Sequence, residues 1–130
     1  ELDYEVIEKD PDAAYLMWGW IKYFADNTPD IKMQFTVPTG CLGEWAWIMP
    51  GAGTLAGSVN GYSVRTESND VGVVRTGYGT SNTDQNTPVS GLFRMSSTPG
   101  NIALQWAQNV SNATATTLYT DSWLMFQRIA

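Results

Sequence analysis

GNIALQWAQNVSNATATTLYTDSWLMFQRIA, residues 100–130, carries the clearest structural signal in the chain. Bulky Ile102, Leu104 and Trp106 alternate with small or polar residues in its first part. Successive side chains of a β-strand point to opposite faces, so a period of two indicates a strand with one bulky and one small face. We therefore expect a strand at residues 102–108.

The same stretch continues with a turn and a second strand. Residues 109–114, NVSNAT, are rich in side chains that hydrogen-bond their own backbone, which favours a turn over continued pairing. Residues 123–129 then carry apolar side chains on both parities. This pattern is typical of a strand in the middle of a sheet, or of one between a core and a partner subunit.

Composition limits the possible classes of protein. The 130 residues fit one domain with a core of its own, and 43% of them are hydrophobic against 15% charged. A disordered chain is therefore not expected, and a net charge of -6 disfavours binding to nucleic acid. Six Trp and six Tyr are many for this length, so we expect some aromatic side chains to face another subunit.

The chain has no histidine and a single cysteine, Cys41. Without histidine, Ser-His-Asp and Cys-His catalysis and the commonest zinc ligand are excluded. The single Cys41 is expected to be a small buried hydrophobic residue. Carboxylates for glycoside hydrolysis are scattered over separate loops: Glu44, Glu67, Asp70 and Asp84. We expect no enzyme activity, no catalytic residues, no cofactor and no metal. No apolar run approaches the roughly 20 residues that span a bilayer, so membrane insertion is not expected either.

Residues 1–12 form an acidic segment with six carboxylates and one lysine. Charges alternate with Leu2 and Tyr4, and Val6 and Ile7 follow. The segment is predicted to be an arm or an edge strand that orders against a neighbouring subunit. Asp10 and Asp12 fall short of the six to eight oxygen ligands that calcium takes, so a solvated acidic segment is favoured over a calcium site.

Six further stretches have the pattern of strands. The clearest is 31–37, which alternates between apolar and polar residues. Residues 15–24, YLMWGWIKYF, are apolar on both parities and rich in aromatics, which favours a strand buried on both faces. The others are 45–49, 59–65, 71–75 and 91–97. Some eight to nine short strands separated by Gly and Pro turns indicate an all-β fold, a β-sandwich.

A polar stretch at residues 76–90 is interpreted as a long loop. Long loops with structured flanks often carry recognition, although a plain connector fits as well. Two aromatics on polar loops, Tyr62 and Tyr78, are candidates for stacking on a sugar ring, and each fits equally well as a residue that pins its loop.

Three separated stretches resemble a pattern in bacteriophage structural proteins. In AYLMWGWIKYF followed by PDIKMQFTVPTGCLGEWAW, an aromatic strand precedes a short turn, Asp-Ile-Lys, an alternating strand, Pro-x-Gly and a Trp. NIALQWAQNVSNATATTLYTDSWLMFQRI is similar to the closing strands of those proteins, and PVSGLFRMSS fits the strand before them. Together they span much of residues 13–129. Cys41, Asp121 and the lack of an obvious full pair of opening strands before residue 15 depart from the pattern.

The resemblance implies a jelly-roll β-sandwich over residues 13–130, of the tumour necrosis factor and complement globular-head type, which forms a homotrimer. It implies a structural protein on the surface of a phage virion: a head decoration, a fibre tip or a tail attachment module, in contact with capsid or tail proteins. The alternative is a monomeric carbohydrate-binding module that recognises a host-surface glycan.

The trimer is also expected from the excess of aromatic residues. Residues 15–24 and 123–129 each offer two apolar faces where a sandwich strand needs one. In the resembled jelly roll these two segments and the strand that carries Trp106 correspond to the inner sheet, whose outward face meets two other copies around a threefold axis. The candidates for the trimer interface, each of which also fits a plain core position, are Trp18, Trp20, Trp106, Trp123 and Phe126.

Overall fold

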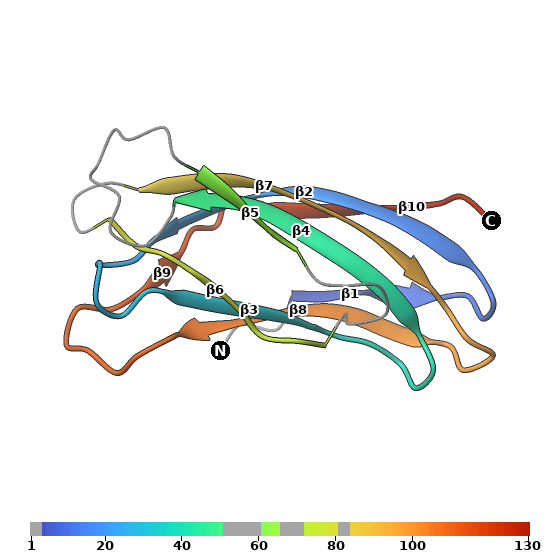
Figure 1. Ribbon diagram of the computed structural model, residues 1–130. Helices are drawn as coiled ribbons and strands as arrows, with labels where there is room; N and C mark the ends of the chain where they lie inside the picture. The colour runs from blue at the N-terminus through green and yellow to red at the C-terminus, as the bar shows by residue number, and fades with distance from the viewer. Residues whose placement is uncertain (1–3, 51–60, 66–71, 81–83) are drawn as a thin grey trace.

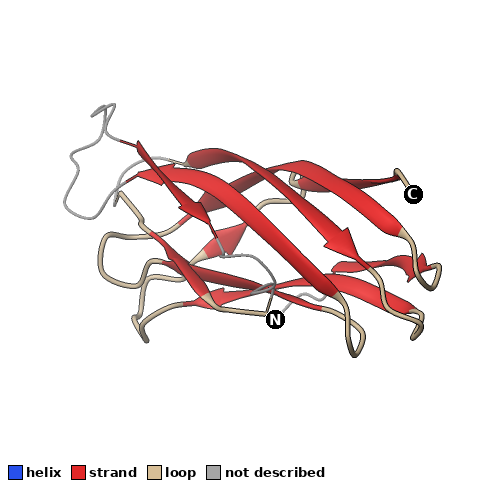
Figure 2. Cartoon of the chain, turned by 45° about the vertical axis from the view of Figure 1, so that its right-hand side comes forward, coloured by secondary structure: helices blue, strands red, loops and turns tan. Residues whose placement is uncertain are grey.

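The computed structural model describes residues 4–50, 61–65, 72–80 and 84–130. Ten β-strands and no helix are present among these residues, which confirms the expected all-β class. The strands are β1 (Tyr4–Lys9), β2 (Ala14–Phe24), β3 (Ile31–Thr36), β4 (Leu42–Pro50), β5 (Gly61–Arg65), β6 (Arg75–Gly77), β7 (Gln85–Arg94), β8 (Gly100–Gln108), β9 (Thr117–Leu118) and β10 (Trp123–Arg128). They form two antiparallel sheets, which lie one above the other as a β-sandwich (Figures 1 and 2).

Strands β1 to β4, and then β5 to β8, alternate between the two sheets. The four-stranded sheet has the order β1-β8-β3-β6, and the six-stranded sheet has the order β10-β2-β7-β4-β5, with β9 also paired to β2. The first eight strands pair in a nested way, as β1 with β8, β2 with β7, β3 with β6 and β4 with β5. The chain is therefore arranged like one long hairpin whose two arms are shared between the sheets.

The C-terminal strand β10 lies at an edge of the six-stranded sheet. Among the described strands its one neighbour is β2, with Trp123 opposite Trp20 and Phe126 opposite Met17. Of the two positions that the sequence allowed, the middle of a sheet is therefore excluded, and a place between the core and a partner remains.

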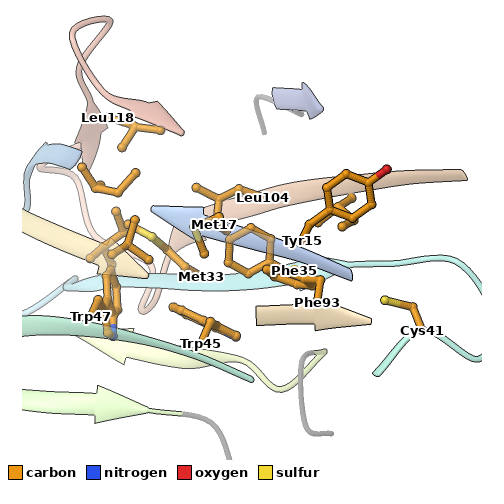
Figure 3. Packing of buried hydrophobic residues seen from close by; sticks show 14 of the residues in the cluster. Tyr15, Met17, Met33, Phe35, Cys41, Trp45, Trp47, Phe93, Leu104 and Leu118 are labelled. Carbon is orange, nitrogen blue, oxygen red and sulfur yellow. The ribbon is translucent and has the colours of Figure 1, made fainter. Parts of the chain in front are cut away.

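The core fills the space between the sheets (Figure 3). Phe35 from the four-stranded sheet contacts Trp45 and Phe93 from the six-stranded sheet, with ring centroids 5.3 and 5.2 Å apart in edge-to-face geometry. Such aromatic pairs add about 0.5–1.5 kcal/mol beyond the burial of their area. Cys41 is buried, as expected, and burial raises the pKa of its thiol.

The alternation expected at residues 31–37 is present in β3. Ile31, Met33 and Phe35 are buried, while the residues between them are partly or fully exposed. The pattern in β2 differs from the expectation, because its odd-numbered residues are buried and its even-numbered residues are half-buried or exposed. Its second apolar face is therefore not covered by the part of the chain that the structure describes.

The polar stretch at 76–90 is not one loop, which corrects the sequence interpretation. Strand β7 begins at Gln85 and pairs with β2 from Tyr23↔Gln85 onward, because β2 is eleven residues long and its full length needs a partner. Thr87 is buried, and its hydroxyl donates to the carbonyl of Ile48. Pro88 has no N–H to donate to β4. The Thr87 hydroxyl therefore supplies a donor at this point of the pairing between β7 and β4.

The acidic N-terminal segment takes the form of an edge strand. The backbone of β1 pairs with β8, with Tyr4 opposite Leu104 and Lys9 opposite Gly100. It therefore orders on its own chain, and not on a neighbour as expected, because main-chain hydrogen bonds to the free edge of β8 do not depend on apolar side chains. After β1, Asp10 Oδ2 accepts a hydrogen bond of 2.7 Å from Arg128 Nη1, which links the two sheets.

Candidate functional site

The outer face of the six-stranded sheet is unusually apolar. On β2 the outward side chains include Leu16, Trp18 and Trp20, and on β10 they include Trp123 and Met125. The register sets Trp123 beside Trp20 and Met125 beside Trp18. Trp20, Trp123 and Met125 are 42, 47 and 50% exposed.

Apolar side chains continue across the next two strands. On β7, Pro88 lies opposite Trp20 and Leu92 lies opposite Leu16. On β4, Ile48 follows Trp47, whose partner is Val89, and Ile48 is 55% exposed. We call this surface the apolar face; it consists of Leu16, Trp18, Trp20, Ile48, Pro88, Leu92, Trp123 and Met125.

Polar side chains beside the apolar face pair with one another. Lys22 Nζ lies 3.3 Å from Asp121 Oδ2 and 5.1 Å from the centre of the Tyr119 ring. Arg94 Nη2 donates to Glu44 Oε1 at 3.2 Å. Such exposed pairs contribute about 0–1 kcal/mol each, so they matter for the charge of the surface more than for stability.

Trp20 is held in place by a hydrogen bond at the same end of the face. Its Nε1 donates to Asn86 Oδ1 at 3.3 Å. Nearby, the Tyr119 hydroxyl donates to Asp84 Oδ1 at 2.8 Å, which raises the pKa of Tyr119. The indole of Trp20 is thus oriented before any partner binds.

Three of the five candidate interface residues meet on the apolar face. Trp18, Trp20 and Trp123 lie on adjacent strands and point outward. Phe126 has the opposite parity on β10 and packs against Phe93, with ring centroids 5.8 Å apart.

Trp106, the fifth candidate, lies on β8 in the other sheet and packs against the core. Its Nε1 is buried and has no hydrogen-bond partner among the described residues. The three segments expected to form one inner sheet are therefore divided between two sheets, because β8 pairs with β1 and β3 and not with β2. The trimer itself stays a prediction.

The structure describes the side chain of only one of the two candidate sugar-stacking residues. Tyr78 is half-buried, packs against the core, and its carbonyl accepts a hydrogen bond of 2.9 Å from the Tyr23 hydroxyl. It therefore pins its loop. The backbone of Tyr62 lies in β5 opposite Met49, and its side chain lies outside the described part of the chain.

Of the four scattered carboxylates, the two that the structure describes each contact another side chain. Glu44 pairs with Arg94 and Asp84 with Tyr119, while Glu67 and Asp70 lie outside the described residues. The described residues contain no group of three or more His, Cys, Asp or Glu side chains that could hold a metal ion. Nor do they contain a helix that could cross a membrane.

One buried carboxylate, Asp30, organises the loops at one end of the sandwich. Its Oδ1 accepts a hydrogen bond of 2.9 Å from the Gly79 N–H, and its carbonyl accepts one of 2.8 Å from the Thr116 hydroxyl. Burial raises the pKa of Asp30, and the hydrogen bond from Gly79 opposes this shift. Burial and the nearby Asp30 also raise the pKa of Tyr23. These contacts join the turns before β3, β7 and β9, which is a structural role.

Sequence reasoning missed Leu16, Met125 and Ile48 as members of the apolar face. Leu16 and Met125 could have been found from the sequence, because they have the same parity as Trp20 and Trp123 on their strands. Residues two or four positions apart on a strand share a face. Ile48 could not be found this way, because its place depends on the pairing of β4 with β7.

No protein-family model matches the chain, and neither a curated protein nor a solved structure shows a significant match.

Proposed function

We propose that this chain is a non-enzymatic structural module of a bacteriophage particle surface, folded as a jelly roll and acting as a trimer. The apolar face carries the proposal. Soluble monomers rarely expose contiguous apolar patches larger than a few hundred Å², and larger ones mark sites of interaction. A face with two tryptophans and a methionine that are each 42–50% exposed is therefore expected to be covered in an assembly.

The strand pairing supports the jelly-roll part of the proposal. A jelly roll is an eight-stranded double sheet built from two Greek keys. The nested pairs β1–β8, β2–β7, β3–β6 and β4–β5, divided between two sheets, support this assignment. In the proposed arrangement β9 and β10 are additions to the free edge of β2.

The placement on a virion rests on the resemblance of the three sequence stretches to phage structural proteins. The role that follows is mechanical or adhesive: head decoration, fibre tip or tail attachment, in contact with capsid or tail proteins. Antibody labelling of intact particles, with the chain identified in them by mass spectrometry, tests this placement. Its absence from purified particles would contradict it.

A monomeric carbohydrate-binding module is the second candidate, and one observation favours it. Trp20 and Trp123 lie side by side with the amide of Asn86 next to them. Aromatic rings combined with a few polar groups suit the stacking and hydrogen bonding of a sugar.

Sedimentation and light scattering of the purified chain at micromolar concentration distinguish the two candidates. A trimer supports the structural module. A folded monomer contradicts the trimer, and binding of that monomer on a glycan array would favour the carbohydrate-binding module.

A further inference from the structure

We propose that the apolar face binds a second copy of this chain, so that contacts between subunits are made by β10, β2, β7 and β4. This inference rests on the proposed oligomeric function and names the surface that would serve it. It places the contact on the six-stranded sheet, whereas the four-stranded sheet stays exposed to water.

The distribution of exposed apolar side chains is strongly one-sided. Of the nine large hydrophobic residues exposed in the described part of the chain, seven lie on or directly beside β2, β4 and β10. The other two, Val74 and Val110, lie outside this sheet. On the four-stranded sheet the outward residues of β3 are Lys32, Gln34 and Thr36, and Gln34 Nε2 donates to Gln105 Oε1 at 2.6 Å. That surface is suited to water.

The apolar side chains form rows across the sheet. Trp123, Trp20, Pro88 and Ile48 follow one another on four neighbouring strands, and Met125 and Trp18 lie in the next row. Four strands about 4.8 Å apart and about nine residues long outline roughly 500 Å² in projection. This is comparable with the ~800 Å² of accessible surface that each partner buries in a standard protein interface.

The charge of the face suits a second copy in particular. The whole chain carries a net charge of -6, so an approach through an acidic surface would be repulsive. The outward charged side chains described on the four strands are Lys22, Glu44 and Arg94. Arg94 pairs with Glu44, and Lys22 pairs with Asp121 at the end of the sheet. Two copies can therefore bring these faces together without placing unpaired like charges opposite each other.

Trp20, Lys22 and Arg94 already use their polar groups within the subunit, which disfavours a sugar at this face. Trp20 Nε1 donates to Asn86, and Lys22 and Arg94 hold the carboxylates of Asp121 and Glu44. A glycan needs several free donors and acceptors for its hydroxyl groups. A partner that presents apolar side chains, as a second copy does, needs few.

The edge of the sheet gives a second reason for coverage by a protein. β10 forms the end of the six-stranded sheet, and its exposed side chains include Trp123 and Met125. An apolar edge strand without Lys or Pro is prone to uncontrolled pairing, and native proteins cover such edges. A second copy seated on the apolar face at β10 would shield this edge as well.

The test compares two substitutions with the same change of charge. Met125→Lys introduces a cation into the apolar face at a residue that is 50% exposed, and Val110→Lys introduces one at a loop residue that is 49% exposed. We expect Met125→Lys to give a folded monomer, with the dissociation constant of the oligomer raised roughly 30-fold or more, because a charge would be buried in the contact. Val110→Lys should leave the oligomer intact. Sedimentation gives the mass, and circular dichroism with thermal melting shows that both variants are folded.

Each outcome separates this inference from the proposed function. If the wild type is a trimer and both Met125→Lys and Trp123→Thr remain trimers, the contact lies elsewhere, and only the inference fails. If Met125→Lys does not fold, Trp123→Thr serves as the test variant in its place, since Thr is compatible with a strand. A wild type that is a folded monomer overturns both. Glycan binding by that monomer, lost in Trp123→Thr, would assign the face to a sugar.

Discussion

Gly19 lies on β2 opposite Leu124 of β10. A Cβ atom at this position would meet the backbone carbonyl oxygen of Trp123, and Leu124 Cδ2 at 2.6 Å. Since the carbonyl belongs to the backbone of a paired strand, it cannot move without loss of pairing. Gly19→Ala is therefore expected to lower the free energy of unfolding by about 1–3 kcal/mol, as overpacking does. Urea denaturation measures the change.

Gly72→Ala is the matched control for this variant. A Cβ atom at Gly72 would have a nearest neighbour, the carbonyl oxygen of Phe35, at an ordinary distance of 3.9 Å. The free energy of unfolding of this variant should lie within about 0.5 kcal/mol of the wild-type value, as is usual for surface substitutions. Equal effects at the two glycines would mean that β10 does not pack against Gly19 as described.

Thr87 tests the hydrogen bond that stands in for the missing N–H of Pro88. Thr87→Val keeps the volume and removes the buried hydroxyl that donates to the Ile48 carbonyl. The expected loss in the free energy of unfolding is about 1–3 kcal/mol. Thr87→Ser keeps the hydroxyl and should lose less. A Ser variant that is less stable than the Val variant would show that packing, not the hydrogen bond, is the main contribution.

Asp30 makes stability depend on pH in a direction opposite to that of a salt-bridged carboxylate. Its pKa is raised from the ordinary value of 3.8, chiefly by burial. Its stabilising contribution is therefore fully present below the unfolded pKa and is lost as the pH rises through the folded pKa. Asp30→Asn keeps an oxygen acceptor for Gly79 and tolerates the local φ of 51°.

We expect Asp30→Asn to remove this pH-dependent contribution. The difference in unfolding free energy between the variant and the wild type should shift in favour of the variant as the pH rises from about 3 to 7. Paired urea titrations at several pH values measure it. A shift in favour of the wild type would mean that the ionised carboxylate stabilises the fold.

Single residues were predicted well from sequence where the pattern was local. The alternation of residues 31–37 identified Ile31, Met33 and Phe35 as buried. A strand with one face on the core and the other in solvent produces this pattern whatever its partners are. Trp106 and Trp123 look alike in sequence, yet one packs against the core and the other is 47% exposed. The difference comes from the strands they pair with, which no local pattern contains.

Among the elements, β1 lends itself to a direct test. Its backbone pairs with β8 near Tyr4, Glu5 and Val6, then again at Lys9 after a shift in register. Deletion of residues 1–9 retains the pair Asp10–Arg128 and should leave a folded sandwich. Loss of a few ladder hydrogen bonds, at about 0.5–1.5 kcal/mol each, predicts a decrease of roughly 1–3 kcal/mol in unfolding stability. Thermal melting followed by circular dichroism measures this.

The outcome of the deletion also bears on the role of the acidic segment. An unfolded product would show that β1 is indispensable to the fold. A product as stable as the full chain would show that β1 does not pair in solution. The expected intermediate result would show that β1 stabilises the sandwich without being required for it.

Strand β7 is the element that sequence reasoning located least well. Its first half, around Gln85 and Asn86, has the composition of a loop, because its outward residues are polar or proline. What makes it a strand is pairing with β2 on one side and β4 on the other. Pairing between distant segments overrides local composition, so the boundary could not be read from residues 76–90 alone.

At the scale of the whole molecule, substitutions to Asp should divide the five candidate interface residues into two groups. Phe126→Asp and Trp106→Asp place a charge against the core and should unfold the subunit, with losses above about 4 kcal/mol. Trp20→Asp and Trp123→Asp place it on the apolar face and should give folded, dissociated subunits. Circular dichroism and light scattering on each variant measure both properties.

Trp18, which is half-buried on the same face, belongs to the second group. Folded and dissociated Trp106→Asp protein would move the contact to the four-stranded sheet. An unfolded Trp20→Asp variant would mean that this side chain is needed for the subunit itself.

The pairing of β10 with β2 also sets an order of events during synthesis. Lys22 and Ser122, which hydrogen-bond to each other, are 100 positions apart in the chain. Strand β2 can pair only after β7 has been translated, and β1 only after β8. Because the pairing is nested, the early strands find most of their partners in segments that are translated later. Long-range pairing of this kind slows folding and leaves strand edges open in the meantime. The emerging chain therefore holds β2 and its tryptophans exposed until nearly all of the described strands have been made, which is when a chaperone would be most useful to it.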